Sequence, residues 1–269
     1  NVSVDGGTIK LDGNYPVGSN NVALGNNALS SGSLSGANNT AIGREAMVSN
    51  TSGSLNVALG STTLDANTTG SSNTAVGQAA LGANTTASSN TAVGYQALLL
   101  NTTGAENVAI GRSALDANTT ASNNTAVGGA ALGANTTGAS NTAIGRQALE
   151  ANTTASNNTA VGYQAGFSTT TGDQNTFVGV ETGDAINTGR RNTALGSFSL
   201  TTDTKGSFSV AVGYGALNLQ NFTSATDIYN TAVGSLAGNA VTTGIRNTLI
   251  GGLAGDALTD ADDNVAIGQ

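Results

Sequence analysis

The sequence of 269 residues contains no His, Cys or Trp, one Pro, and only 9% charged and 4% aromatic residues. Without His and Cys there can be no imidazole base, thiolate nucleophile, disulfide or zinc site of the usual nitrogen–sulfur type. No apolar run reaches the roughly 18 residues of a membrane span, and the 8 basic residues form no long cluster for phosphates. We therefore expect no cofactor, no metal, no nucleic-acid partner and no membrane insertion.

Charge is scarce while Val, Ile and Leu recur steadily, which is the opposite of the composition of a disordered chain. With 38 Gly and few aromatic residues, however, the chain cannot fill a thick core. The sequence starts at Asn1 without Met and stops at Gln269 inside a motif, so we expect it to be a segment of something longer. These features predict an ordered but thin structure.

A pentapeptide, Asn-Thr/Val-Ala-Val/Ile/Leu-Gly with a few departures, occurs fifteen times. Twelve of the fourteen intervals between copies are 17 residues long, which defines repeat positions 1 to 17. The copies begin at residues 21, 39, 56, 73, 90, 107, 124, 141, 158, 175, 192, 209, 230, 247 and 264. A period this strict predicts one structural unit per repeat.

Position 5 is always Gly, as expected for a tight corner that needs positive φ or close backbone approach. The β-branched residues before it are typical of a short strand. Stacked repeats would also align Asn at positions 1 and 12 into amide ladders. We predict an all-β, parallel β-solenoid of about fifteen coils over residues 21–269, preceded by a strand/turn cap or connector over residues 1–20. The predicted turn glycines include Gly43, Gly77, Gly94, Gly111, Gly128, Gly145 and Gly162.

Position 3 is Ala in thirteen copies and lies on the opposite strand face from the aliphatic position 4. Because both faces are apolar, we expect both to be buried, with the Ala column packing on another copy of the chain. Position 9 changes from Leu to Gly in several later coils, which predicts a narrower or bent interior after about residue 160. The predicted oligomer-packing residues are Ala41, Ala75, Ala92, Ala109, Ala126, Ala143 and Ala160.

The repeated pentapeptide over residues 21–268 resembles the head repeats of trimeric autotransporter adhesins, the YadA-like head. With the segments Tyr95–Leu98 and Asn101–Gly104, and the opening Gly7–Gly18, the chain is even more similar to fibre proteins of marine and cyanobacterial bacteriophages. Adhesin heads commonly have a shorter coil with Val at position 2, so the cross-section can differ. The resemblance implies a left-handed homotrimeric rod located on a virion or a cell surface.

Several side chains are candidates for chemistry or binding. Position 10 carries acids in five coils, but the nearest are two coils apart, about 9.6 Å, on a convex surface, so we expect no glycoside-cleaving pair and no enzyme. These acids are Asp65, Asp116, Glu150, Asp184 and Asp256. Arg44, Arg112 and Arg146 share position 6 with three tyrosines, and a four-residue lengthening within residues 217–229 predicts a protruding loop. The candidate receptor contacts are Tyr95, Tyr163, Tyr214, Phe222 and Tyr229.

Three function classes are compatible with these observations. The first is a structural and adhesive fibre segment, as in a phage tail fibre, which binds a host-surface receptor, for example a carbohydrate, through repeated weak contacts. A cell-surface adhesin head is the alternative within this class. The second is an ice-binding solenoid, disfavoured because the Thr pair at positions 13 and 14 points to opposite faces. The third is a depolymerising enzyme, for which no groove with paired acids is visible.

Overall fold

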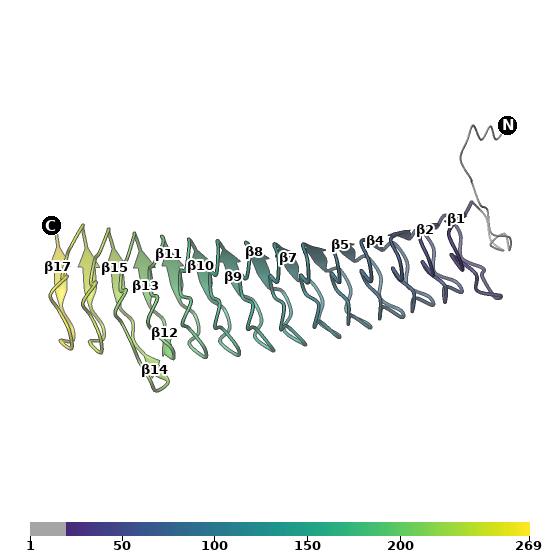
Figure 1. The fold of residues 1–269 in the computed structure, drawn as a ribbon. Helices are drawn as coiled ribbons and strands as arrows, with labels where there is room; N and C mark the ends of the chain where they lie inside the picture. Colours follow the sequence, from purple (N-terminus) through teal and green to yellow (C-terminus); the bar gives the residue numbers. More distant parts are fainter. Residues whose placement is uncertain (1–19) are drawn as a thin grey trace, which may run out of the picture.

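The computed structural model describes residues 20–269, so the predicted N-terminal connector lies, apart from Asn20, outside the described residues. The described chain forms a parallel β-solenoid of about 14 turns of about 17 residues, without a helix, which confirms the predicted fold class. Figure 1 shows the coils stacked in chain order into a long rod, with the strands lined up along one side.

Each turn contributes one three-residue strand to a 15-stranded sheet, and two extra strands pair beside it. The strands are β1 (Val22–Leu24), β2 (Thr40–Ile42), β3 (Val57–Leu59), β4 (Thr74–Val76), β5 (Thr91–Val93), β6 (Val108–Ile110), β7 (Thr125–Val127), β8 (Thr142–Ile144), β9 (Thr159–Val161), β10 (Thr176–Val178), β11 (Thr193–Leu195), β12 (Gly206–Ser207), β13 (Val210–Val212), β14 (Thr226–Asp227), β15 (Thr231–Val233), β16 (Thr248–Ile250) and β17 (Val265–Ile267).

The register places equal repeat positions side by side, as in the pairs Thr125↔Thr142 and Ala126↔Ala143. The lengthened turn causes no slip, because Ala211 still pairs with Ala232. Its extra residues leave the coil and return through β14, which pairs with β12 and projects from the rod edge (Figure 1). The insertion is therefore accommodated outside the coil.

The corner glycines adopt the predicted positive φ in all fifteen copies. At Gly128, with φ +137°, an added Cβ would lie only 2.5 Å from the carbonyl oxygen of Gly145 on the next coil. The sequence did not reveal that positions 7, 9 and 17 also have positive φ, as at Gln96, Leu98 and Glu106. Bulky residues in this region are strained. Hydrogen bonds between coils, such as Leu98 N–H to the carbonyl of Ala114, hold them there.

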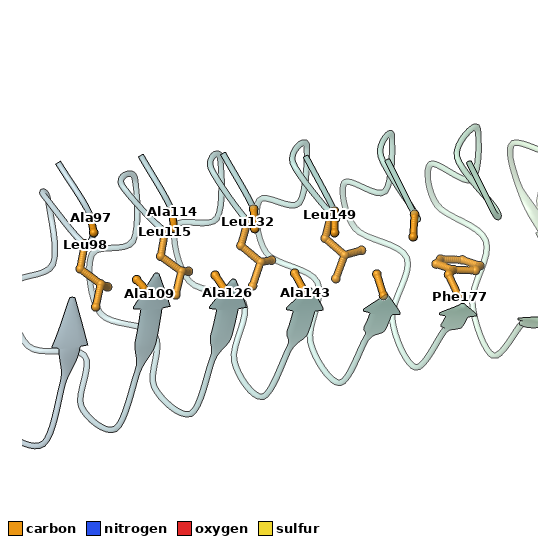
Figure 2. Close-up of a cluster of buried hydrophobic side chains, with 14 of the residues drawn as sticks. Ala97, Leu98, Ala109, Ala114, Leu115, Ala126, Leu132, Ala143, Leu149 and Phe177 are labelled. Atoms are coloured by element: carbon orange, nitrogen blue, oxygen red, sulfur yellow. The ribbon is translucent and has the colours of Figure 1, made fainter. Parts of the chain in front are cut away.

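The position-3 alanines point into the coil and not toward another copy, so the predicted role of the Ala column was wrong. Figure 2 shows Ala109, Ala126 and Ala143 directed from their strands toward leucines of the opposite wall, such as Leu132. All of these side chains are fully buried within one chain, which leaves them no surface for a partner. The same holds for the other proposed packing residues, Ala41, Ala75, Ala92 and Ala160.

The interior does not narrow after residue 160, because larger side chains at position 3 fill the space that position 9 gives up. Phe177 lies between two of the position-9 glycines: a Cβ on Gly166 would be 2.7 Å, and one on Gly183 2.4 Å, from its ring. Leu249 occupies the corresponding space beside Gly238 and Gly255. Both large side chains are fully buried. A larger side chain at position 3, on the strand, thus compensates for the missing side chain at position 9 on the opposite wall of the coil.

Two ladders of buried amides run along the coil interior, as predicted. At position 12, Asn118 donates from Nδ2 to Oδ1 of Asn101 (2.8 Å) and to the carbonyl of Ala121 (3.0 Å). At position 1, the backbone N–H of Asn124 donates to Oδ1 of Asn107 (2.9 Å), and its amide donates to Gly138 O (2.9 Å). These bonds offset the cost of burying amides in a narrow coil.

Candidate functional site

The outward face of the long sheet is the first candidate surface. Position 2, Thr or Val, and position 4, always Val, Ile or Leu, point away from the coil interior, while position 3 is buried on every strand except the terminal β1 and β17, where it is partly buried. Ile110 and Ile144 are about two-fifths exposed, and Leu195 is almost half exposed. An unbroken aliphatic column therefore follows the whole rod in the single chain.

A second candidate surface is the row of position-6 side chains that follows the corner glycines. Tyr95 and Tyr163 are exposed, as predicted for receptor contacts, and between them on successive coils lie Arg112, Gly129 and Arg146. The Arg146 guanidinium lies 5.8 Å from the centre of the Tyr163 ring. The two arginines border a hollow of about 360 Å³ over Gly129.

The other predicted contacts lie around the insertion and do not form one group. Tyr214 is exposed and meets Phe198 edge-on, with ring centres 5.8 Å apart. Tyr229 is exposed and stacks on Phe208 with ring centres 5.1 Å apart. Phe222 is buried at 8% exposure, so its predicted role as a surface contact was wrong. Its ring is withdrawn from solvent at the base of the insertion.

A buried polar network supports this insertion. Asp203, which replaces the ladder Asn at position 12, accepts bonds from the backbone N–H groups of Gly206 (3.0 Å) and Phe222 (3.1 Å). Gln220 donates from Nε2 to Asp203 Oδ2 (2.7 Å) and accepts from the amide of Asn230 (2.9 Å). Burial raises the pKa of Asp203 above its ordinary value, although these hydrogen bonds oppose the shift.

A hollow of about 830 Å³ lies beside the insertion and is bordered by both charged and hydroxyl side chains. Its lining comprises Thr171, Asp173, Thr188, Arg190, Lys205, Ser207, Ala225, Thr226 and Asp227. A second hollow of about 720 Å³ shares Thr188 and Lys205 and includes Thr223 of the insertion. Sequence reasoning missed this region because it arises from neighbouring coils plus the insertion. The sequence signal that could have found it is the charge at position 14 (Lys205) and at position 16 (Asp173 and Arg190).

The position-10 acids remain separate from these hollows. None of the three hollows described above is lined by any of them. Burial raises the pKa of Asp65 and of Asp116, and burial together with Glu181 raises the pKa of Asp184 to about 6. Within residues 20–269 no group of three or more acidic side chains could hold a metal ion.

Comparison with known proteins gives no identity to these surfaces. No protein-family model matches the chain, and no curated protein or solved structure matches it. Over residues 20–269 no helix is long and apolar enough to cross a membrane. The sheet face, the position-6 row and the hollows are therefore the features of this chain that can indicate a function.

Proposed function

We propose that this chain is a non-enzymatic segment of a homotrimeric adhesive fibre, of the phage tail-fibre class, that holds receptor-binding surfaces away from a virion. The observation that carries the proposal is the exposed aliphatic column on the 15-stranded sheet. Long contiguous apolar surfaces are uncommon on monomers and mark interaction sites. Packing three rods through this face would cover the column.

The geometry of the sheet face supports parallel association of identical rods. Its strands are in register along the rod, so the same two side-chain types recur at every coil. Fourteen steps at about 4.8 Å give a column roughly 67 Å long. Equivalent columns on identical rods would meet over that whole length. The copy number of three and the virion location rest on the resemblance of the repeat to adhesin heads and phage fibres, with a cell-surface adhesin head as the alternative.

The position of the candidate binding side chains fits a display role for the rest of the surface. The candidate binding side chains Tyr95, Tyr163 and Tyr229 lie outside the sheet strands, so packing the sheet faces together leaves the rows that carry them outside the strand interface. A homotrimer would present three copies of each, and such repetition multiplies weak contacts with a cell surface. The host receptor is therefore expected at the rows or at the insertion.

The test replaces one outward aliphatic residue with a charge. We expect the unmodified segment to scatter light as three times 26.1 kDa, and Ile144→Asp to dissociate it, because assembly would bury unpaired carboxylates. Since Ile144 is exposed in the single chain, the coil itself should still fold. Thr137→Asp, at exposed position 14 of a neighbouring coil, is the matched control and should leave the mass unchanged. A monomeric parent, or a trimeric Ile144→Asp variant, would contradict the proposal.

Ice binding is a second candidate, favoured by one observation. The sheet face carries an outward Thr column at position 2, seen at Thr125 and Thr142, on strands in parallel register. The Thr pair at positions 13 and 14 is less suited to bind ice, because the hydroxyl of Thr119 at position 13 donates a hydrogen bond to the carbonyl of Thr136 (3.1 Å). A monomer that depresses the freezing point of water below its melting point would favour ice binding over the fibre.

A further inference from the structure

We propose that the hollow beside the insertion binds an acidic oligosaccharide through Arg190 and Lys205, with Asp173 and Asp227 taking sugar hydroxyls. The inference deepens the proposed fibre function, on which it rests, by assigning the receptor class and the place where it binds. Four features carry it: the shape of the hollow, its charges, the aromatic stack next to it, and the insertion that ends it.

The shape follows from the coil. Positions 14 and 16 flank position 15, which is occupied by Gly172, Gly189 and Gly206 in the three coils beside the insertion, and they face outward except at the buried Ser207. An added Cβ on Gly189 would lie 2.2 Å from Gly206 O, so this inner position stays small. The two outward rows form the side walls, and the segment 225–227 closes one end. A linear ligand can lie along such a valley.

Positive charge is concentrated beside this hollow. Three of the seven described cations, Arg190, Arg191 and Lys205, fall within one 16-residue stretch of a chain with net charge −8. Among residues 20–269, neither Arg190 nor Lys205 forms an ion pair. In the coils from residue 39 to 157, positions 14 and 16 carry only Ser, Thr and Ala. Because these two cations have no ion-pair partner in the described chain, they are suited to bind a ligand that carries an acidic group.

The row next to the hollow provides an aromatic platform. At position 17, directly after Arg190 and Ser207 of the lining, Arg191 places its guanidinium 5.3 Å from the centre of the Phe208 ring. Phe208 in turn stacks on Tyr229, with 24° between the ring planes. Tyr229 is 53% exposed, so one ring face and its hydroxyl remain accessible. Amphipathic rings of this kind bind the apolar face and the hydroxyl edge of a sugar together.

The mixture of charges selects the ligand class. Asp173 and Asp227 would repel a polyphosphate chain, but as carboxylates they accept hydrogen bonds from hydroxyl groups. Arg190 and Lys205 donate to a carboxylate on the same saccharide, and the hydroxyls of Thr171, Thr188 and Ser207 complete a polar wall. A saccharide with both hydroxyl and acid groups satisfies every lining side chain, whereas a neutral sugar leaves the cations unpaired.

Titration calorimetry on the purified segment tests the assignment, with a mannuronate hexasaccharide as the acidic probe and maltohexaose as the neutral one. We expect the acidic probe to bind and maltohexaose not to. Replacing both cations, Arg190→Gln with Lys205→Gln, should weaken binding at least about tenfold, the loss expected for charge-assisted bonds. Raised salt should weaken it as well. Tyr229→Asn, which tolerates the positive φ at that position, should weaken binding several-fold.

Arg112→Gln is the matched control, because it removes one exposed cation from the separate hollow over Gly129. It should leave binding unchanged. Failure of the acidic probe to bind, equal binding of maltohexaose, or a loss caused by Arg112→Gln and not by the double variant would each overturn the proposal. Light scattering on the same samples separates the two proposals. A trimer that does not bind the probe would contradict only the proposed saccharide site, whereas a monomer that binds the probe would support the site and contradict the trimeric fibre.

Discussion

Between residues 39 and 157 every coil has Ala at position 3, Leu or Met at position 9 and Asn at position 12, whereas from residue 158 onward all three columns vary. Strand pairing and the corner φ values are nonetheless the same in both regions. The coil is therefore defined by its backbone hydrogen bonds and corner glycines. The side chains inside need only fill a fixed volume and pair their polar groups.

The ladders show the same difference. Position 12 carries seven successive Asn residues up to Asn152, whose Oδ1 has no hydrogen-bond partner where Thr169 follows it. Beyond that point position 12 carries both polar and apolar residues, and the hydrogen bonds of Asp203 with Gln220 and with the backbone of Phe222 anchor the insertion. Variation in the second region thus accompanies the charged hollow and the inserted segment, while the uniform region has neither. Three predictions sharpen this comparison.

The largest effect is expected where core volume has been exchanged. Phe177→Ala should reduce the free energy of unfolding by about 3–5 kcal/mol, because Gly166 and Gly183 leave a cavity that no neighbour can fill. Adding Gly166→Leu and Gly183→Leu recreates the uniform pattern, at φ values of 62° and 58° that resemble those of the native leucines. We expect this triple variant to regain at least half of the loss in denaturant unfolding at matched concentration.

Gly183→Leu alone provides the control, because its Cβ would lie 2.4 Å from the Phe177 ring. Overpacking of this kind should cost about 1–3 kcal/mol. The same substitution is thus expected to harm the parent and to help the Phe177→Ala variant. If Gly183→Leu changes the free energy of unfolding in the same direction in the parent and in the Phe177→Ala variant, the side chains at positions 3 and 9 do not compensate for each other in volume.

A smaller effect is expected in the uniform region. Asn118→Ala removes a ladder amide that also accepts from Nδ2 of Asn135 (3.0 Å), and it leaves buried polar groups of Asn101 and Asn135 unpaired. An unsatisfied buried group costs about 1–3 kcal/mol, so we expect a loss of about 2 kcal/mol in thermal or denaturant unfolding. Asn123→Ala, at position 17, is the control; beyond losing a residue suited to its φ of 62°, it should change little. Equal losses would show that the ladder contributes nothing specific.

The solenoid, its register, the corner glycines and both amide ladders could be predicted from the sequence, because each follows from a strict period acting on one residue type. The face of a three-residue strand that turns inward could not be predicted from the sequence. Larger apolar residues are usually the better core candidates, but a coil this thin has room for Ala126 opposite Leu132 and not for Val127. The alanines were consequently assigned to an interface between copies, whereas in the structure they fill the coil interior and the aliphatic columns face outward.

The candidate site was less predictable for a related reason. Tyr229 and the insertion were identified because each interrupts the repeat, but burial of Phe222 depends on the network around Asp203. The hollow needs outward residues from three coils and the returning segment 225–227. Charged residues at a repeat position predict such a hollow only when it is known whether that position points outward or into the coil. The structure provides this information for positions 14 and 16.

The smallest effect is expected at Asp184, whose side chain is half-buried and whose Oδ1 has no hydrogen-bond partner. Burial, and then the charge of Glu181, raise its pKa to about 6, from an ordinary value of 3.8. The folded chain therefore holds this proton more tightly than the unfolded chain, so the stability contributed is complete below about pH 4 and is lost as the pH rises toward 6. Asp184→Asn should stabilise the fold at pH 7 by about 1 kcal/mol after allowance for solvent screening, and little at pH 4.

Denaturant unfolding of the parent and the variant at the two pH values measures this difference. Asp116→Asn is the comparison, because Asp116 lies in the uniform region and burial raises its pKa in the same direction. A stabilisation that does not depend on pH would assign the gain to packing of the amide instead of to the buried charge.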